Sequence, residues 1–359
     1  MNQNFNYKWT LKEANFTKDK GNVFSCFACG GGSTMGYKLA GFNVLGCNEI
    51  DPKMIEAYKI NHNPKYAFLE PIQTFKNRKD LPKELYELDI LDGSPPCSSF
   101  SMAGKRDKDW GKEKKFREGQ AEQILDTLFF DFIDLAKELK PKVIIAENVK
   151  GLLMGKAKDY VKKIYEDFDK AGYYLQHHLL DASKMGIPQK RQRVFFIGIR
   201  KDLANNLNTI DCFTKIPNLK LDFNEKEIHF SEIYQKGVSS TKHEQNSRLH
   251  NWWKQRIPND KSVGDIVKRL ENRSSMFSVM LLNNNEVAPT FTRQDRSMLY
   301  EEFRSVNKEE ACMLQSFPLD YNFSTKQYGY LIGMSVPPLM IAKISTEIYN
   351  QWNIIFNKN

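Results

Sequence analysis

A turn stiffened by prolines carries a cysteine that could act as a nucleophile. Residues 92–101 read DGSPPCSSFS and follow an apolar run, so Cys97 is expected just past the carboxyl end of a strand, where open α/β sheets bind their ligands. The two prolines restrict the backbone, and a thiol held in a cleft becomes a nucleophile when its pKa is lowered. A buried, inert cysteine is the alternative interpretation.

Further polar side chains follow other expected strands. Glu147 ends an apolar run and could serve as a general acid that faces Cys97. Capping of the following helix is the alternative role for this carboxylate. Gln189, Arg191 and Arg193 alternate at the start of a later strand, so their side chains are expected to project together from one face. The alternative interpretation is a solvated basic surface.

A glycine-rich turn precedes these motifs. Residues 27–36 read FACGGGSTMG, and such glycines permit positive φ and the close approach of a ligand, while the helix beyond offers amides to an anion. Glu49 follows the next strand, about 20 residues on, where nucleoside-binding α/β folds hold ribose hydroxyls. The pair favours a nucleoside-containing cofactor over a purely structural turn. Cys26 and Cys29 form a C-x-x-C pair, but no second pair has ligand spacing, so we expect no metal.

The elements that must position these residues alternate along the first 200 positions. Short β-branched runs and longer amphipathic segments are typical of strand-helix units around a parallel sheet. The expected strands are 23–27, 44–48, 88–91, 143–146 and 193–199, and the expected helices are 35–40, 52–61, 120–139 and 160–171. After residue 200 the alternation of strand and helix patterns stops. It returns only with a sheet-like pattern at residues 328–332 and an expected helix at 338–355. The pattern predicts a doubly wound α/β domain interrupted by a less regular module.

Composition indicates a folded protein with an anionic partner. The 359 residues are 41% hydrophobic and 27% charged, with a net charge of +9, which excludes a disordered or collagen-like chain. The excess of positive charge is concentrated: residues 105–117, 184–201 and 242–273 together carry +14, so the remainder is acidic. Concentrated charge of this kind fits a surface that follows phosphates. No apolar run reaches the length of a spanning helix and the N-terminus is polar, so we expect a cytoplasmic protein with six free cysteines.

The motifs resemble those of the DNA (cytosine-5) methyltransferase family in order and spacing. Beyond those above, Ala288-Pro289-Thr290, residues 314–318 (LQSFP) and residues 333–338 (GMSVPP) extend the resemblance over nearly the whole chain. The resemblance implies an α/β fold, namely a Rossmann-like, doubly wound methyltransferase domain that binds S-adenosylmethionine, with a smaller, irregular target-recognition domain. We expect residues 1–200 and 326–359 to form the first domain and residues 201–325 to form the second.

The resemblance also assigns roles. Cys97 would add to carbon 6 of cytosine, Glu147 would hold a proton to ring N3, and Arg193 would contact O2, with Arg191 and Gln189 in support. The base must leave the duplex for this attack. Cofactor contacts are expected from Phe27, Ala28, Cys29, Gly30, Gly32, Glu49, Ile50, Ile72, Pro96, Leu128, Ser335 and Val336. DNA contacts are expected from Ser101, Lys105, Arg106, Arg191, Arg193, Lys254 and Arg256, the first three in a basic loop, 98–117, that would close over the base.

Three positions depart from the family pattern. Cys29 replaces the usual first glycine of the turn, so we expect that this residue does not need a positive φ. Met334 stands where asparagine is usual, and residues 70–72 read EPI where Gly-Asp-Ile is usual, so no carboxylate is assigned to the adenine. None of these changes touches Cys97 or Glu147.

The sequence therefore predicts an active DNA (cytosine-5) methyltransferase that modifies one short duplex sequence, in the manner of restriction-modification systems. A monomer that uses S-adenosylmethionine and double-stranded DNA, without a metal or a membrane, is expected. A separately acting restriction endonuclease is left open. The alternatives are a tRNA cytosine-5 methyltransferase and a catalytically silent DNA-binding homologue.

Overall fold

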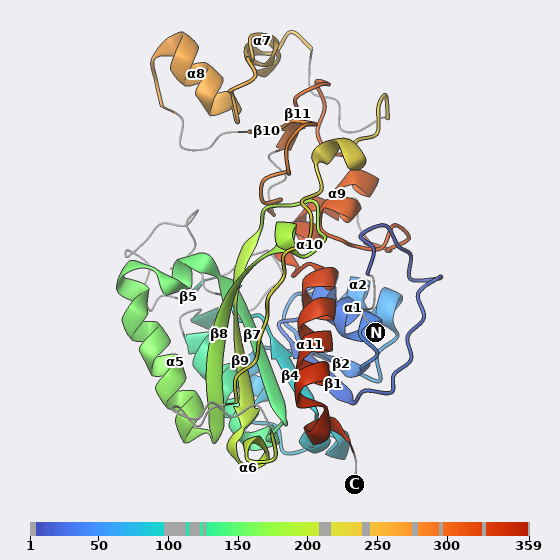
Figure 1. Ribbon diagram of the computed structural model, residues 1–359, viewed down its shortest axis with the longest axis vertical. Helices are drawn as coiled ribbons and strands as arrows, with labels where there is room; N and C mark the ends of the chain where they lie inside the picture. The colour runs from blue at the N-terminus through green and yellow to red at the C-terminus, as the bar shows by residue number, and fades with distance from the viewer. Residues whose placement is uncertain are drawn as a thin grey trace. The chain divides into compact units, whose positions relative to one another are not determined.

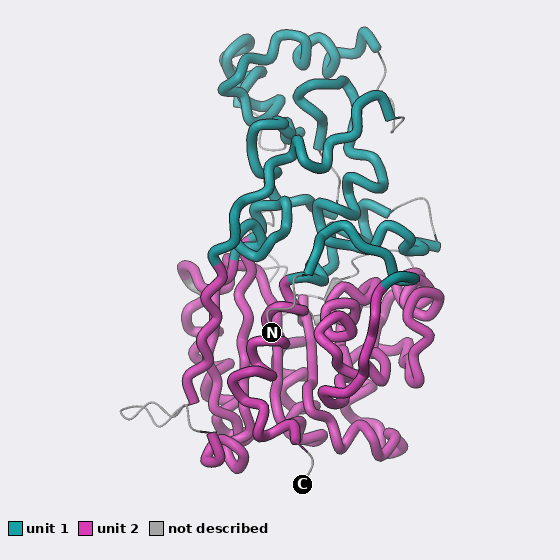
Figure 2. The backbone as a smooth tube through the Cα atoms, turned by 45° about the vertical axis from the view of Figure 1, so that its right-hand side comes forward, with its two compact units in different colours: residues 1–13, 181–191, 224–339 teal, residues 14–180, 192–223, 340–359 magenta. Residues whose placement is uncertain are grey.

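The computed structural model describes residues 5–96, 127–207, 217–238, 245–274, 279–293, 297–324 and 328–357, together with the backbone of 113–114 and 123–124. The chain folds into two compact units, coloured separately in Figure 2. Unit 1 contains residues 1–13, 181–191 and 224–339, and unit 2 contains residues 14–180, 192–223 and 340–359. The chain therefore passes between the units several times, and unit 2 runs past the break expected at residue 200.

Unit 2 is built on a seven-stranded sheet of order β3-β2-β1-β4-β7-β9-β8 (Figure 1). The strands are β1 (Asn22–Cys26), β2 (Asn43–Glu49), β3 (Tyr66–Leu69), β4 (Ile90–Gly93), β7 (Val143–Val149), β8 (Tyr173–Asp181) and β9 (Gln192–Arg200). From β3 to β7 every pairing is parallel. β9 pairs antiparallel with β7, so this side of the sheet departs from the parallel arrangement of the other strands.

The strand order reverses direction at β1. The chain moves from β1 to β2 and β3 on one side and then places β4 on the other side of β1. The carboxyl ends of β1 and β4 thus flank a topological switch point, which is where open α/β sheets bind ligands. The glycine-rich turn leaves β1 and the prolines before Cys97 follow β4, so both motifs lie at this edge.

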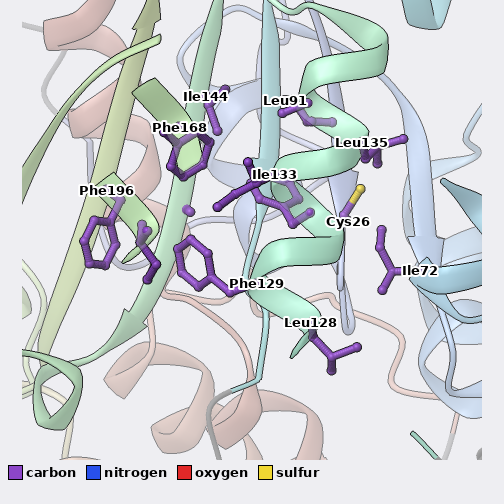
Figure 3. Close-up of a cluster of buried hydrophobic side chains, with 14 of the residues drawn as sticks. Cys26, Ile72, Leu91, Leu128, Phe129, Ile133, Leu135, Ile144, Phe168 and Phe196 are labelled. Carbon is purple, nitrogen blue, oxygen red and sulfur yellow. The ribbon is translucent and has the colours of Figure 1, made fainter. Parts of the chain in front are cut away.

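Helices cover the sheet and bury its apolar side chains. Unit 2 contains α1 (Gly32–Leu39), α2 (Pro52–His62), α3 (Ile72–Phe75), η1 (Lys83–Glu87), α4 (Leu128–Leu139), η3 (Lys150–Leu153), η4 (Gly155–Ala157), α5 (Lys158–Lys170) and α6 (Lys201–Ala204). Figure 3 shows Phe129 and Ile133 of α4 among side chains from β7, β9 and α5, in the largest buried cluster described. Such burial contributes about 1.5–3 kcal/mol for each large apolar side chain.

Helix α4 is shorter than its apolar pattern predicts. The expected helix 120–139 begins at Leu128, while residues 123–124 form the short strand β6 (Gln123–Ile124), paired with β5 (Glu113–Lys114). Periodicity alone marked the apolar residues but not the start of the helix. The C-terminal helix α11 (Pro338–Phe356) matches its expected range, with non-helical dihedral angles at Trp352. Residues 328–356 are long and apolar enough to span a membrane, yet 78% of their most apolar window is buried inside the protein, as in a core helix.

Unit 1 consists of short elements joined by irregular segments. It contains η5 (Ala182–Lys184), η6 (Phe230–Glu232), α7 (Arg248–Lys254), α8 (Val263–Glu271), β10 (Met280–Leu282), β11 (Ser297–Leu299), α9 (Lys308–Leu314) and α10 (Tyr328–Met334). Residues 328–332, expected as sheet, are helical. The side chains of Trp252 and Trp253 pack against a small core that includes Ile266, Leu281 and Met298, which is the structural role expected of a tryptophan pair in a small domain.

Candidate active site

An ion pair joins Glu147 to Arg193 across two neighbouring strands. β7 carries Glu147 and β9 carries Arg193, and their antiparallel register places Val149 opposite Arg193. Arg193 Nε lies 2.9 Å from Glu147 Oε1, with both side chains mostly buried. A carboxyl group and a guanidinium held together at a strand end can address adjacent polar atoms of one planar ring, because one group shares a proton while the other donates.

The neighbouring residue, Asn148, connects this pair to the turn that leads to Cys97. Its side-chain amide donates to the carbonyl oxygen of Pro95 over 3.1 Å, and its Oδ1 accepts from the amide of Val149 at 2.9 Å. Gly93 pairs with Ala146 in the β4–β7 register, so the turn and Glu147 leave neighbouring strands at the same level. Cys97 itself lies outside the described residues, which end at Pro96 before this loop.

Glu49 links the glycine-rich turn after β1 to the loop after β2. Its Oε2 accepts the amide of Cys29 at 2.7 Å, and its Oε1 accepts the amides of Ile50 and Asp51 at 2.8 and 2.9 Å. Burial raises the pKa of Glu49, and these backbone hydrogen bonds oppose the rise. A carboxylate offers about four acceptor positions, of which three are used, so Glu49 retains capacity for one hydroxyl donor from a ligand.

The backbone of the glycine-rich turn adopts left-handed conformations at three positions. The φ angles are 54° at Phe27, 48° at Cys29 and 83° at Gly31. The expectation that Cys29 would avoid positive φ is therefore wrong. Its amide must point at Glu49, and this hydrogen bond offsets strain of about 1–2 kcal/mol for a non-glycine residue. Gly31 caps α1 without a side chain, which leaves the amides of the first turn facing the end of β1.

Asp92 is a buried carboxyl group that the sequence reasoning did not select. It lies at the carboxyl end of β4, is 1% exposed, and accepts hydrogen bonds from Ser25 Oγ at 2.6 Å and Tyr37 Oη at 3.0 Å. Burial raises its pKa from 3.8 to about 7, in opposition to these hydrogen bonds, and the charge of Glu147 adds to the rise. The signal that could have found it is an acidic residue within the apolar run LDILDG, on a central strand.

Residues 21–350 match the sequence model of the C-5 cytosine-specific DNA methylase family. The chain belongs to this family. Its family and its seven-stranded fold are those of S-adenosylmethionine-dependent methyltransferases.

Several relatives of this C-5 cytosine methylase are type II methyltransferases. M.FnuDI of Fusobacterium nucleatum is 35% identical over 181 residues, a stretch that spans only 50% of this chain and 47% of that protein. M.DdeI of Desulfomicrobium norvegicum is 27% identical over 94% of this chain and 91% of its own length. Among solved structures, a protein encoded within an Escherichia coli prophage and described as a DNA modification methyltransferase has a TM-score of 0.62 at 23% identity, covering 92% and 99% of the two chains. This last similarity concerns the fold.

In this methylase, Gln189 and Arg191 do not share a strand face with Arg193. β9 begins at Gln192, so both residues precede the strand, and their buried side chains hydrogen bond within unit 1. Arg191 donates to the carbonyl oxygens of Phe291, Gly333 and Ser335 at 3.0–3.2 Å. The expectation of three donors projecting together is therefore wrong.

The remaining cofactor candidates occupy varied surroundings. Gly30, Gly32 and Ala28 are buried in the glycine-rich turn, while Ile50 and Pro96 are half-buried. Ile72 and Leu128 belong to the large buried cluster of unit 2, which accounts for their burial without a ligand. Ser335 and Val336 are buried in unit 1, next to Met334, which is 38% exposed.

The residues expected to contact DNA also lie in varied surroundings. Ser101, Lys105 and Arg106 lie outside the described residues, and Lys254 is exposed at the end of α7. Arg256 stacks over the ring of Trp253, at 3.6 Å from its centroid, and donates to the carbonyl oxygen of Tyr300. The described residues show four free cysteines, namely Cys26, Cys29, Cys47 and Cys312, and no group of three metal-ligating side chains.

Proposed function

We propose that this methylase transfers a methyl group to carbon 5 of a cytosine flipped out of a specific short duplex DNA sequence. The observation that carries the proposal is the Glu147–Arg193 ion pair, held beside the Pro95 turn through Asn148. Family membership supplies the reaction class, and the matched motifs supply Cys97 as the nucleophile.

The chemistry requires a nucleophile because carbon 5 of cytosine is too electron-poor to attack a methyl sulfonium. The Cys97 thiolate adds to carbon 6, and the proton that Glu147 shares with ring N3 neutralises the ring as the bond forms. Arg193 donates to O2 and holds the carboxyl group in place. Carbon 5 would then take the methyl group, with S-adenosylhomocysteine as the other product, and loss of the carbon 5 proton to a base would restore the double bond and expel the thiolate. Arg191 and Gln189 support the site through their buried hydrogen bonds within unit 1, to Ser335 and Gln315 among others, and not through contact with the base.

S-adenosylmethionine fits the loops at the switch point, where it supplies the methyl group when bound. Glu49 retains an acceptor position for a ribose hydroxyl, and the turn at residues 27–31 presents backbone amides there. We assign Phe27, Ala28, Cys29, Gly30, Gly32, Glu49, Ile50, Pro96, Ser335 and Val336 to the cofactor, as the family motifs imply; Ile72 and Leu128 would support its pocket from the core.

The smaller unit is proposed to read the DNA sequence. It contains Lys254 and the cation-aromatic pairs of α7, where Arg248 lies over Trp252 at 4.7 Å. The basic segment containing Ser101, Lys105 and Arg106 is proposed to follow the phosphates. We place the enzyme in the cytoplasm as a monomer, and a separately acting restriction endonuclease is left open.

One experiment tests the proposal. The protein is expressed in a host that lacks cytosine methylation, and 5-methylcytosine is mapped by bisulfite sequencing of plasmid DNA and, in parallel, of tRNA. Methylation of one short DNA sequence, abolished by Cys97→Ser, is the expected result. Methylation of tRNA alone would establish the RNA alternative, and no methylation of either by a protein that still binds duplex DNA would establish a silent homologue.

A further inference from the structure

The carbonyl oxygen of Ser335 receives two side-chain donors from distant parts of the chain. Gln315 Nε2 lies 2.7 Å from it and Arg191 Nη2 lies 3.1 Å from it. Arg191 also donates to the carbonyl oxygen of Gly333 at 3.2 Å, so the two ends of the segment 333–335 are held by one guanidinium. All of these atoms belong to unit 1, and Arg191, Gln315 and Ser335 are buried.

Gln189 extends this network by one residue. Its Nε2 donates to Gln315 Oε1 at 2.6 Å and to the carbonyl oxygen of Leu314 at 2.8 Å, while its Oε1 accepts the amide of Phe291 at 2.8 Å. This leaves the Gln315 amide oriented with its nitrogen toward Ser335, because its oxygen is taken by Gln189. The side chain of Gln189 thereby fixes the orientation of a second side chain.

The segment 333–335 is packed tightly against neighbouring backbone. A side chain at Gly333 would overlap the backbone of Thr292 and Arg293, so the segment lies directly against these two residues, next to Phe291, whose carbonyl oxygen also accepts from Arg191. The Ser335 hydroxyl donates back to the carbonyl oxygen of Leu331 at 2.8 Å. The hydrogen bonds of Arg191 and Gln315 therefore hold the backbone of residues 333–335, where α10 ends, and those of Gln189 hold Gln315 in place.

We infer that Gln189, Arg191 and Gln315 are positioning residues for the cofactor, acting through the segment 333–335 rather than on the cytosine. The inference rests on the proposed function, which assigns Ser335 to the S-adenosylmethionine carboxylate. Within five residues of sequence, Gln189 and Arg191 then serve the cofactor and Arg193 serves the base, since Arg193 pairs with Glu147 while Arg191 donates to Ser335 and Gln189 to Gln315. Substitutions two residues apart should alter different kinetic constants.

The test compares Arg191→Lys with Arg193→Lys, which both keep the charge and lose the guanidinium fork. Binding of S-adenosylmethionine and of S-adenosylhomocysteine is measured by titration calorimetry, and kcat is measured at saturating cofactor on a methylatable duplex. Arg191→Lys is expected to weaken the binding of both compounds at least tenfold, and its kcat at saturating cofactor is expected to fall by a smaller factor than that of Arg193→Lys. Arg193→Lys is expected to lower kcat at least tenfold and to leave cofactor affinity within twofold.

A second variant keeps the inference testable if Arg191→Lys fails to fold. Gln315→Met removes a donor to Ser335 while keeping the volume of the side chain and the charge of the protein, and it is expected to weaken cofactor binding at least threefold. Unchanged cofactor affinity in a folded Arg191→Lys or Gln315→Met protein would overturn the inference. Failure of the unaltered protein to bind the cofactor at all would instead overturn the proposed function, so the two failures are distinguishable.

Discussion

The side-chain amide of Asn148 donates to the carbonyl oxygen of Pro95 over 3.1 Å. This bond ties the residue after Glu147 to the residue two positions before Cys97, from neighbouring strands β7 and β4. A single buried amide, 3% exposed, thus ties strand β7, which carries Glu147, to the turn that follows β4. Neither the carboxyl group nor the turn can shift independently of the other.

Asn148→Ala should therefore damage the chemical step more than cofactor binding. A misplacement of about 1 Å in an active site can lower a rate by about 100-fold, so we expect kcat to fall between tenfold and 100-fold, with cofactor affinity changed less than threefold. Single-turnover methylation and calorimetry measure the two quantities. Asn77→Ala, which removes an exposed amide bonded to the carbonyl oxygen of Gln73, is the matched control and should have no effect on either.

Glu147→Gln should remove the proposed acidic proton while keeping the contact with Arg193. Glutamine keeps an oxygen that can accept from Arg193 but holds no carboxyl proton, so the variant retains the geometry of the pair and loses the proposed acid. General acid catalysis is typically worth about 100-fold or more, and we expect a decrease in kcat of at least that size. Formation of a covalent adduct on duplex DNA containing 5-fluorocytosine should slow by a similar factor. A variant that forms the adduct at the normal rate would contradict the role of Glu147.

Glu49→Ala should weaken both the cofactor site and the fold. The carboxylate is the acceptor for the amides of Cys29, Ile50 and Asp51, and the loss of a buried acceptor typically costs about 1–3 kcal/mol. We expect a lower melting temperature and at least tenfold weaker cofactor binding, measured by calorimetry. Glu49→Gln keeps one carbonyl oxygen and should show a smaller loss of both. Equal losses in the two variants would indicate that hydrogen bonding to the loops is not the function of Glu49.

Sequence patterns predicted those elements whose signals are local. Helix α2 starts at Pro52 because Asp51 caps the amides of Lys53 and Met54, and it ends at Asn63 in a left-handed conformation, all of which are familiar start and stop signals. The resemblance assigns Glu147 and Arg193 to the same base, and the structure joins them in an ion pair across β7 and β9.

The sequence could not show which partners distant segments would provide. The spacing of Gln189, Arg191 and Arg193 suggested a common face, but Gln315 and Ser335, more than 100 residues away, determine where two of these side chains lie. Similarly, the positive φ of Cys29 follows from its hydrogen bond to Glu49, a tertiary contact that no local propensity encodes. Strand β8 was missed because its buried residues, Tyr173, Leu175 and Leu180, do not keep a regular alternation across the adjacent His177 and His178.

Gly31→Ala should destabilise unit 2 by more than conformational strain alone. Gly31 has a φ of 83°, and a side chain there would overlap the ring of His62 and contact Tyr58 at 3.0 Å. Gly172→Ala is the matched control, since Gly172 has a φ of 91° with open space around it, and this variant should lose about 1 kcal/mol in the free energy of unfolding. We expect Gly31→Ala to lose at least about 1 kcal/mol more than the control, measured by urea denaturation. Equal losses would mean that His62 moves aside freely.

Asp92→Asn should remove a pH dependence from the stability of the protein. Burial raises the pKa of Asp92 from 3.8 to about 7, with Ser25 and Tyr37 donating to the carboxyl group and Glu147 facing it as a like charge. The folded state therefore keeps its proton over a range in which the unfolded state has lost it. Stability must fall as the pH rises from about 4 to about 7, and the full loss is present above pH 7.

The size of this effect follows from the shift, because one pKa unit corresponds to about 1.4 kcal/mol. The free energy of unfolding of Asp92→Asn, minus that of the unaltered protein, should increase by about 2–4 kcal/mol between pH 4 and pH 7, as measured by urea denaturation at several pH values. Asp222→Asn, which changes an exposed carboxyl group, controls for the loss of one charge and should give a difference that stays constant with pH. A constant difference for Asp92→Asn as well would mean that Asp92 ionises in the folded protein as readily as in the unfolded chain, so that its three neighbours, and not its burial, determine its charge.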